Sequence, residues 1–279
     1  MANVLAYADL FQQTLDEVLI KESVTGWMTE NASQVIYNGG NKYKVPKIDM
    51  DDIEDYDRTA GFANGSVTLE YEEKTFEKDW GKSFSIDAMD VDETNYVATV
   101  SNVLGQFVRT KVVPKVDTYR LTKLASEAGV KTTYKAVKSD IFSTIKADLS
   151  KICGETGVDE ENVVIHIARS AFDVLCDSTE LQKSLQVNGA AADLNSKVKT
   201  INGATLIVTP DSRMGGNNWI MAVKTAPVAI NKHEKVRQFS PDVNQNADAY
   251  KVDYRLYHTL NVNDNQKAAV LVNGESVVE

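Results

Sequence analysis

The sequence has few of the residues on which enzyme active sites depend. It contains three histidines, and no G-x-S-x-G turn supplies a serine nucleophile to any of them. Neither the G-x-G-x-x-G pattern nor the phosphate-loop pattern of nucleotide-binding proteins is present. His166 lies inside an apolar run and is predicted to be a buried core residue, whereas His233 is expected to be exposed. We therefore expect no catalytic residue, no cofactor and no metal ion.

Cysteine is scarcer still. Cys153 and Cys176 are the only two, and both are predicted to be buried, reduced thiols of an intracellular protein. The sequence does not decide whether the two cysteines form a disulfide. No second cysteine or histidine lies close enough in the sequence to complete a metal-ligand set.

Long hydrophobic runs and an excess of positive charge are also missing. No stretch of about twenty apolar residues is present to span a membrane, and the N-terminus lacks the basic region and apolar core of a signal peptide. The net charge of −10 argues against a general nucleic-acid binder, because such proteins carry a basic face. An acidic wall is still compatible with a container for DNA.

What is present is a strongly patterned segment that predicts a long hairpin. Val67, Leu69 and Tyr71 alternate with polar residues, so one face of this strand is apolar. The alternation returns around Phe84, and we place the turn of the hairpin at residues 77–81. A lone ribbon of two strands is marginal in water. We therefore expect the hairpin to be covered, either by its own domain or by a neighbouring subunit.

An acidic segment, residues 49–57, precedes the hairpin. Its carboxylates could in principle bind calcium, but the glycine and the final glutamate of an EF-hand loop are missing. A solvated acidic turn is the favoured interpretation. An ion-pair partner for a basic patch on a neighbouring subunit is the next.

A long helix is predicted directly after the hairpin. Asp90 and Glu93 have capping-box spacing, and apolar residues recur at helical spacing from Tyr96 to Val108. Pro114 is expected to end or kink this helix, and Gly129 is expected to stop its continuation.

The rest of the chain is predicted to be a mixture of helices and short strands. Residues 1–48 are interpreted as a partly helical arm with a turn at Asn38–Asn41 and an edge strand after it. Asn202-Gly203 predicts a two-residue hairpin turn. The other predicted elements are helices at 141–153, 170–177 and 180–185 and strands at 163–167, 219–223, 228–236, 250–256 and 268–272.

The order of these segments resembles the major capsid proteins of tailed bacteriophages, which share the Hong Kong 97 fold. The similarity covers about residues 49–260 and rests on GF-x-NGS, the hairpin, DAMDVDETN, VVP-x-VD-x-YR, INGATLIVTPDSRM and AINKHEKVRQFSPDVNQNADAYKVDYRLYHTL. The resemblance implies an α+β fold with an N-terminal arm, an extended hairpin loop, a peripheral domain with a long spine helix, and an axial domain.

The domain boundaries that follow from the resemblance are these. The arm covers 1–48, the extended loop 49–90, the peripheral domain 91–133 and 226–265, and the axial domain 134–225 and 266–279. The polar, glycine-rich loop 211–218 is then a candidate for contact at a symmetry axis of a shell. An ordinary surface turn is an equal alternative.

The resemblance also implies a structural role rather than an enzymatic one. Copies of the chain would self-assemble, as hexamers and pentamers, into an icosahedral or prolate head shell that encloses double-stranded phage DNA without sequence-specific binding. The expected partners are a separate scaffolding protein and a portal. Whether decoration proteins also bind is left open, and no membrane is expected to take part. The chain would be assembled in the host bacterial cytoplasm and would be located in the virion.

Five aromatic residues are the predicted anchors of contacts between subunits: Trp27, Tyr71, Phe76, Trp80 and Phe84. Some members of the resembled family crosslink a hairpin lysine to an asparagine, but ordinary surface lysines are the favoured interpretation here. An encapsulin-like compartment around an enzyme cargo is the alternative within the same fold. A monomeric enzyme with an atypical site is the alternative from another class.

Overall fold

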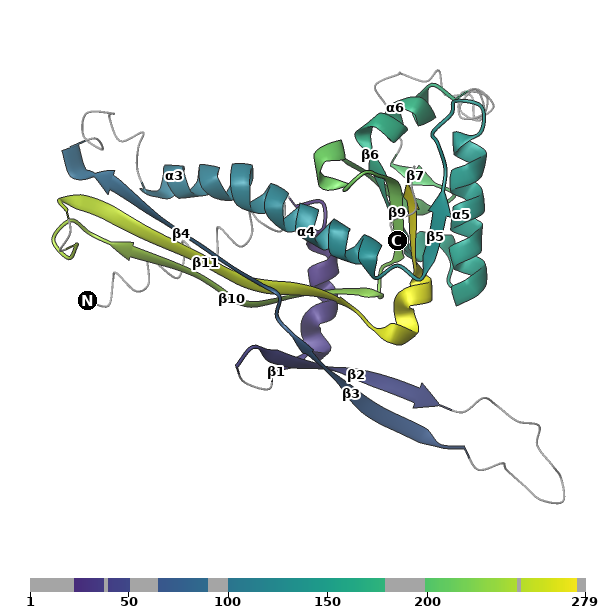
Figure 1. The fold of residues 1–279 in the computed structure, drawn as a ribbon, viewed down its shortest axis with the longest axis horizontal. Helices are drawn as coiled ribbons and strands as arrows, with labels where there is room; N and C mark the ends of the chain where they lie inside the picture. Colours follow the sequence, from purple (N-terminus) through teal and green to yellow (C-terminus); the bar gives the residue numbers. More distant parts are fainter. Residues whose placement is uncertain are drawn as a thin grey trace.

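The structure is a computed structural model that describes residues 23–37, 40–50, 65–89, 100–178, 199–244 and 247–274. Figure 1 shows an elongated molecule with three parts. A long sheet lies under a long helix, a compact domain sits at one end of them, and a narrow ribbon of strands projects away from the sheet.

The compact domain is built on a six-stranded mixed sheet. The strand order is β5 (Val130–Thr133), β12 (Val270–Gly274), β9 (Asn217–Val223), β6 (Val163–Ala168), β8 (Ala204–Thr209) and β7 (Thr200–Ile201). Every residue of the central strands β6, β9 and β12 is buried. A strand buried on both faces reads as a continuous apolar run, which is why the sequence identified β6 and β9 correctly.

Two helices pack on this sheet, α5 (Ile141–Thr156) and α6 (Arg169–Cys176). Ile145, Leu149 and Ile152 form the buried stripe of α5 in the same core as Trp219 and Leu271. The predicted Asn202-Gly203 turn is confirmed between β7 and β8. Both turn residues have positive φ, 50° and 94°, as a two-residue hairpin turn of this kind requires.

The long sheet has three antiparallel strands, in the order β10 (Pro227–Phe239), β11 (Ala249–Val262) and β4 (Lys78–Asp87). The predicted strand at 250–256 is confirmed as part of β11, in which Tyr250 is exposed and Val252, Tyr254 and Leu256 are buried. They pack against a helical rod made of α3 (Val100–Phe107), a π-helical turn η2 (Val108–Val112) and α4 (Val113–Ser126).

Pro114 does not end this rod. It is the second residue of α4, and α4 directly follows the π-helical turn. Proline has no amide N–H to donate to the preceding turn, and a π-helical turn is one of the irregularities by which a helix accommodates such a loss. Gly129 is needed for a different reason from the predicted one, because a Cβ there would lie 2.6 Å from the carbonyl oxygen of Lys267.

The predicted hairpin pairing is wrong. The strand β3 (Val67–Thr75) pairs with the preceding strand β2 (Lys42–Met50), and β4 pairs with β11. No turn forms at residues 77–81; the chain runs from β3 into β4 and so joins two different sheets (Figure 1). Alternation specifies which face of a strand is apolar, but it does not specify the neighbouring strand.

The ribbon sheet is completed by β1 (Ile36–Tyr37), so β2 is its middle strand and not the predicted edge. Because β1 pairs only opposite Tyr43 and Lys44, Pro46 lies beyond it on an open stretch of β2, where a missing N–H is tolerated. Short 3-10 helices complete the described fold: η1 (Gly26–Gln34), η3 (Glu160–Asn162), η4 (Asp211–Arg213) and η5 (Asp264–Ala269).

Both cysteines are free thiols, but neither is fully buried as predicted: Cys153 is half-buried and Cys176 is exposed. It is the last residue of α6, where Leu175 is the residue that packs into the core. Several predictions lie outside the described residues: the acidic segment 49–57 from residue 51 onward, the helix start at Asp90 and Glu93, the helix at 180–185 and the first part of the arm. Among the helices that the structure describes, none is long and apolar enough to cross a membrane.

Candidate interaction surfaces

His166 is a buried core residue, as predicted. It is fully buried, and the indole N–H of Trp27 donates a hydrogen bond to its Nε2 over 3.2 Å. Its Nδ1 lies 3.4 Å from the hydroxyl of Thr209. Burial lowers the pKa of His166 to about 4, so the ring is neutral at pH 7. No group of three or more metal-ligating side chains occurs in the described residues.

His258 is also fully buried, between the rings of Trp80 and Tyr119 at centroid distances of 4.7 Å and 5.2 Å. Within the described part of the chain, neither of its ring nitrogens has a hydrogen-bond partner. Burial, helped by the nearby Arg120 and Lys78, lowers its pKa to about 3. A neutral ring packed between two aromatic rings acts here as an apolar side chain.

The carboxylate of Asp117, on α4, is the centre of a buried polar cluster. It accepts hydrogen bonds from the hydroxyl of Thr25 at 2.7 Å and from Arg213 Nη1 at 2.9 Å. Arg120 donates to the carbonyl of Thr25 over 3.3 Å, and burial lowers its pKa to about 10. This cluster fastens the segment before η1 and the loop after β8 to the helical rod.

That loop includes the predicted axis candidate at 211–218. Asp211, Ser212, Gly215 and Gly216 are exposed, as in a surface turn, whereas Met214 is buried and the loop packs against α4. Gly215 and Gly216 have φ values of 62° and 85°, which side-chain-bearing residues rarely adopt. Contact at a symmetry axis remains a prediction for this loop.

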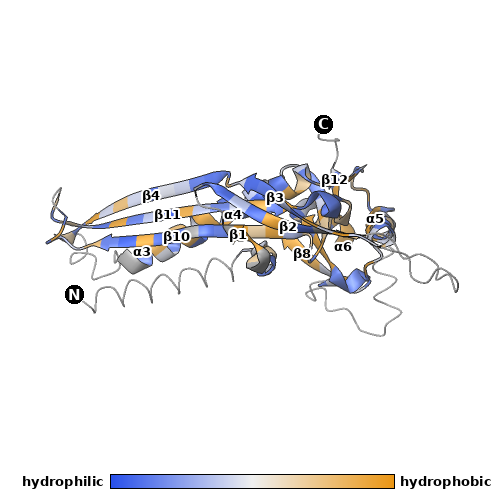
Figure 2. Cartoon of the chain, turned by 90° about the horizontal axis from the view of Figure 1, so that it is seen from below, coloured by the Kyte–Doolittle hydropathy of each residue, from blue (hydrophilic) through white to orange (hydrophobic). Residues whose placement is uncertain are grey.

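The β2–β3 ribbon carries an apolar face that the described residues leave open. Met50 is 67% exposed, Val67 71%, Leu69 54% and Tyr71 45%. Val67, Leu69 and Tyr71 share one face by alternation, and Met50 is the cross-strand partner of Val67. Figure 2 shows hydrophobic and hydrophilic positions interspersed along β2 and β3. Neighbouring exposed apolar side chains of this kind are typical of a contact site.

Of the five predicted contact anchors, only Tyr71 is largely exposed; the other four pack within their own chain. Phe76 is 7% exposed, between Tyr43 and Tyr257. Trp80 lies against His258, Phe84 against Phe107 and Trp27 against His166. The role of all five in contacts between subunits stays a prediction.

A cavity of about 290 Å³ opens between β4, β11 and the helical rod. Its apolar lining includes Trp80, Phe107 and Tyr254, and three lysines surround it: Lys82, Lys111 and Lys115. We call it the lysine-rimmed pocket. The sequence did not predict this pocket, because no spacing along the chain links Lys111 and Lys115 of the helical rod to Trp80 of β4.

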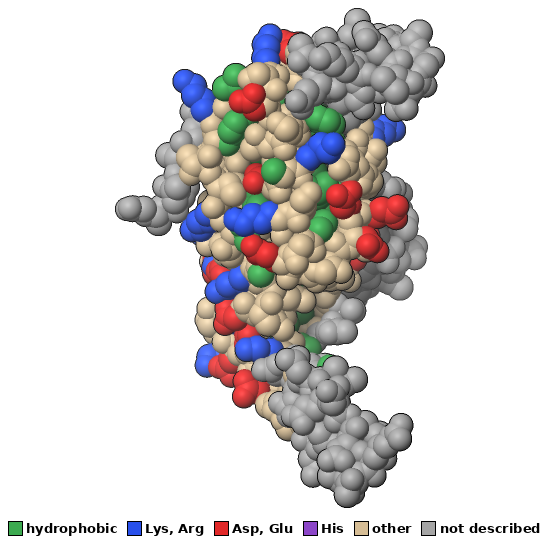
Figure 3. All heavy atoms as spheres, turned by 90° about the vertical axis from the view of Figure 1, so that its right-hand side faces the viewer, with side chains coloured by type: hydrophobic (Ala, Val, Ile, Leu, Met, Phe, Trp, Pro, Cys, Tyr) green, Lys and Arg blue, Asp and Glu red, His purple; other side chains and the backbone are tan. Residues whose placement is uncertain are grey.

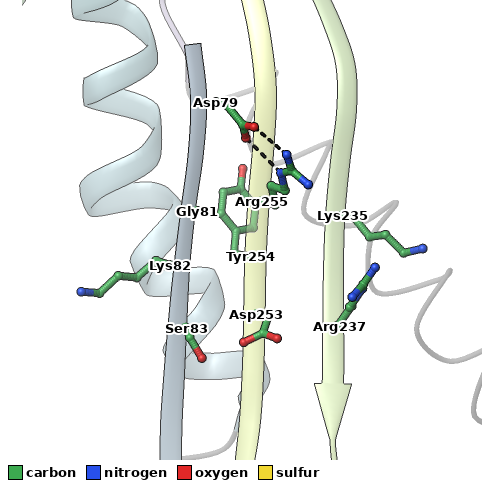
Figure 4. A pocket seen from close by; sticks show the side chains of 9 residues that line it. All are labelled: Asp79, Gly81, Lys82, Ser83, Lys235, Arg237, Asp253, Tyr254 and Arg255. Atoms are coloured by element: carbon green, nitrogen blue, oxygen red, sulfur yellow. Dashed lines mark hydrogen bonds and ion pairs between the residues drawn. The ribbon is translucent and has the colours of Figure 1, made fainter. Parts of the chain in front are cut away.

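A second hollow of about 390 Å³ lies on the opposite face of the long sheet (Figure 4). It opens where Gly81 has no side chain, and Lys235 and Arg237 of β10 line its other side. Asp79 forms a two-point ion pair with Arg255, with N–O distances of 3.0 Å and 2.6 Å, and this interaction raises the pKa of Arg255. Asp253 adds a second carboxylate, so this hollow has mixed charge.

The end of the molecule formed by the compact domain differs from both hollows. Figure 3 shows basic and acidic side chains interspersed on the face turned to the viewer, with small apolar areas between them. Mixed charge of this kind is the usual condition of a protein surface. The visible part of this face therefore carries no single-sign patch.

Comparisons with known proteins identify the fold. No protein-family model and no curated protein sequence matches the chain. Solved structures do match. A chain from Mycobacterium phage Che8 is 14% identical, with a TM-score of 0.65 over 85% of each chain. A chain of the mature capsid of bacteriophage PhiM1 is 10% identical, with a TM-score of 0.63 over 88% of this chain and 85% of that one.

A virus-like particle from Pyrococcus furiosus is also similar, at 12% identity and a TM-score of 0.59, covering 96% of this chain and 99% of the other. At such low identities the likeness is one of fold. The chain therefore has the α+β capsid fold, of Hong Kong 97 type, that its sequence predicted.

Proposed function

We propose that this chain is the major capsid protein of a tailed bacteriophage. Copies of it self-assemble into an icosahedral or prolate head shell that encloses double-stranded DNA. The observation that carries the proposal is the open apolar face of the β2–β3 ribbon, on a fold shared with phage capsid chains. A two-stranded extension with an exposed apolar face is marginal alone, and a neighbouring copy is the surface that covers it.

The parts of the fold take the following roles in the proposal. The six-stranded sheet with α5 and α6 is the axial domain, and the long sheet with its helical rod is the peripheral domain. The ribbon is the extended loop. Because β4 pairs with β11, residues 78–87 belong with the peripheral domain, and the extended loop becomes shorter than the predicted 49–90.

The mechanism of assembly is geometric. Each strand of the ribbon has nine residues, and a strand of that length reaches about 30 Å. Such an arm spans a large part of a neighbouring subunit. A contact of standard size buries roughly 1,600 Å², so a subunit held by several contacts leaves only when all of them break together.

The proposed partners are further copies of the chain as hexamers and pentamers, a separate scaffolding protein and a portal. The role is structural and not enzymatic, and the place of action is the virion after assembly in the bacterial cytoplasm. The net charge of −10 supports a wall that encloses DNA without gripping its phosphates, because like charges repel.

An encapsulin-like compartment is the second candidate. The observation in its favour is the match to the Pyrococcus furiosus particle over nearly the whole of both chains. The two candidates differ in what the particle contains. Nuclease-resistant DNA together with a portal supports the head shell, whereas a packaged enzyme supports the compartment.

Electron microscopy of the purified protein, alone and with its scaffolding partner, tests assembly. We expect closed angular shells from the native chain. Leu69→Asp, on the apolar face of the ribbon, should leave folded subunits that form no shells. Thr68→Asp is the matched control on the other face and should still assemble. Small species alone in both native preparations would refute the proposal.

A further inference from the structure

The lysine-rimmed pocket has an unbalanced positive charge. No acidic residue lines it. Among the described residues, neither Lys82 nor Lys111 has an ion-pair partner, and the ammonium of Lys115 lies 4.6 Å from the centre of the Trp80 ring. All three lysines are exposed. In a chain whose net charge is −10, a local cluster of cations around an aromatic lining calls for a partner of opposite charge.

The chemistry of the pocket defines that partner. Its lining of Trp80, Phe107, Val112, Tyr254 and Leu256 favours an apolar or aromatic side chain. The lysines around it favour carboxylates on both sides of that side chain. The volume lies near the small end of the range for binding pockets, which suits one or two side chains and not a large ligand.

One segment of this chain has that chemistry. Residues 51–57 read DDIEDYD, in which Ile53 and Tyr56 are the apolar residues and the other five are acidic. We propose that this acidic segment of a second copy docks in the lysine-rimmed pocket. Ile53 and Tyr56 lie on the apolar lining, and the flanking carboxylates pair with the three lysines. The inference rests on the proposed function, because it assigns the ribbon's point of attachment.

The segment of the same copy cannot reach the pocket. It follows Met50 at the far end of the ribbon, whereas Gly81 of the pocket lies beyond the junction of β3 and β4 (Figure 1). From Val67, the partner of Met50, to Gly81 the strands cover about 45 Å at 3.3 Å per residue. Seven residues beyond Met50 reach at most about 25 Å. The occupant therefore comes from another copy.

The hollow on the opposite face of the sheet is the weaker receptor. Its own carboxylates, Asp79 and Asp253, already face the cations there, and Asp79 is paired with Arg255. An acidic segment would be repelled by these two groups. It would also find less apolar lining.

A peptide tests the pocket independently of shell formation. The probe is the fluorescently labelled segment 49–57 with blocked ends, added to unassembled subunits. We expect binding that weakens with salt and falls about tenfold in the subunit Lys82→Glu/Lys111→Glu, because two attractive charge contacts become repulsive ones. The control subunit Lys135→Glu/Lys151→Glu, with the same charge change at exposed sites of the compact domain, should bind normally. Equal binding to both variants, or none to the native subunit, would overturn the proposal.

Assembly gives the second measurement. Lys82→Glu/Lys111→Glu should form few shells, and adding Asp52→Lys/Glu54→Lys should restore them, because the charges are then exchanged. If the native chain forms shells and Lys82→Glu/Lys111→Glu forms them equally well, the docking site is refuted. The proposed function is then still supported. Peptide binding without native shells would support the docking site and refute the proposed function.

Discussion

The compact domain and the β2–β3 ribbon use apolar residues in opposite ways. In the compact domain every residue of β6, β9 and β12 is buried, and α5 contributes Ile145, Leu149 and Ile152 to the same core. In the ribbon, Val67 and Leu69 are more than half exposed. The first region completes its core within one chain, whereas the second has an apolar face that the described residues leave exposed, and the proposed function assigns this face to contact with a neighbouring copy.

Under the proposed function, the stability of the subunit and the association between subunits depend on different regions of the chain. The central strands of the compact domain have neighbours on both sides and helices over them, so their burial stabilises the single subunit. The ribbon strand β2 buries Tyr43 and Val45 in a small cluster with Ile230, whereas the far end of the ribbon is exposed at Met50 and Val67. Substitutions in the two regions should therefore act on different measurements.

The largest effect is expected from the core of the compact domain. Trp219 is fully buried, and its indole N–H donates to Asp148 Oδ2 over 2.9 Å. Trp219→Ala should lower the free energy of unfolding of the subunit by about 3–5 kcal/mol, because it leaves a large cavity. Urea denaturation followed by circular dichroism measures this. A loss below about 1 kcal/mol would contradict the view that the core of the compact domain stabilises the single subunit.

The next effect concerns the cluster that joins the compact domain to the helical rod. Asp117→Asn keeps the volume but leaves Arg213 without its counter-ion, 2.9 Å away in the native chain. Breaking a buried pair costs about 3 kcal/mol or more, and the same denaturation experiment detects it. Asp173→Asn, in the exposed pair with Arg169, is the control and should cost less than about 1 kcal/mol. Equal losses would mean that the cluster is open to water.

Mild acid should destabilise the subunit through its two buried histidines. Their pKa values, about 4 for His166 and about 3 for His258, lie below the unfolded value of about 6.5. The unfolded chain therefore binds more protons, and stability is lost as the pH falls below about 6.5. At pH 5.5 each histidine should cost about 1 kcal/mol relative to pH 7 or higher.

Urea denaturation at pH 7 and at pH 5.5 measures this loss. His258→Leu should remove about half of the difference between the two pH values, because it removes one of the two titrating groups. If the stability difference between pH 7 and pH 5.5 were unchanged in this variant, the pKa of His258 would not be lowered in the folded chain.

The smallest effect on the subunit is expected from the ribbon. Tyr71→Ser removes a side chain that is 45% exposed, so the free energy of unfolding of the unassembled subunit should change by less than about 0.5 kcal/mol. Shell yield, measured by sedimentation, should nevertheless fall. If Tyr71→Ser greatly lowered the stability of the subunit and shells still formed normally, the ribbon would contribute to subunit stability and not to association.

The sequence predicted much of the fold because many of its patterns are local. The apolar runs of β6 and β9, the alternation of β11 and the Asn202-Gly203 turn each depend on residues that are adjacent in the chain. The burial of His166 followed from the apolar run around it. The helix boundaries near Pro114 were less accurate, because the rod continues through a π-helical turn.

The candidate site was less predictable. Tyr71 was identified and is exposed, whereas Phe76, Trp80 and Phe84 pack against residues far along the chain, such as Tyr257 and His258. The lysine-rimmed pocket depends on β4 lying beside β11 and under the helical rod. No spacing in the sequence links Lys82 to Lys111.

The faces of the strands and helices could be read from the sequence because they follow from side-chain periodicity, which acts over a few residues. The Asn202-Gly203 turn depends on two adjacent residues, and the family resemblance rests on the motifs and on the order of the segments. The pairing of β3 with β2, the pairing of β4 with β11 and the meeting of three lysines around Trp80 appeared only in the folded chain. Several strands can satisfy the same alternation equally well, and the choice among them depends on the packing of the whole chain.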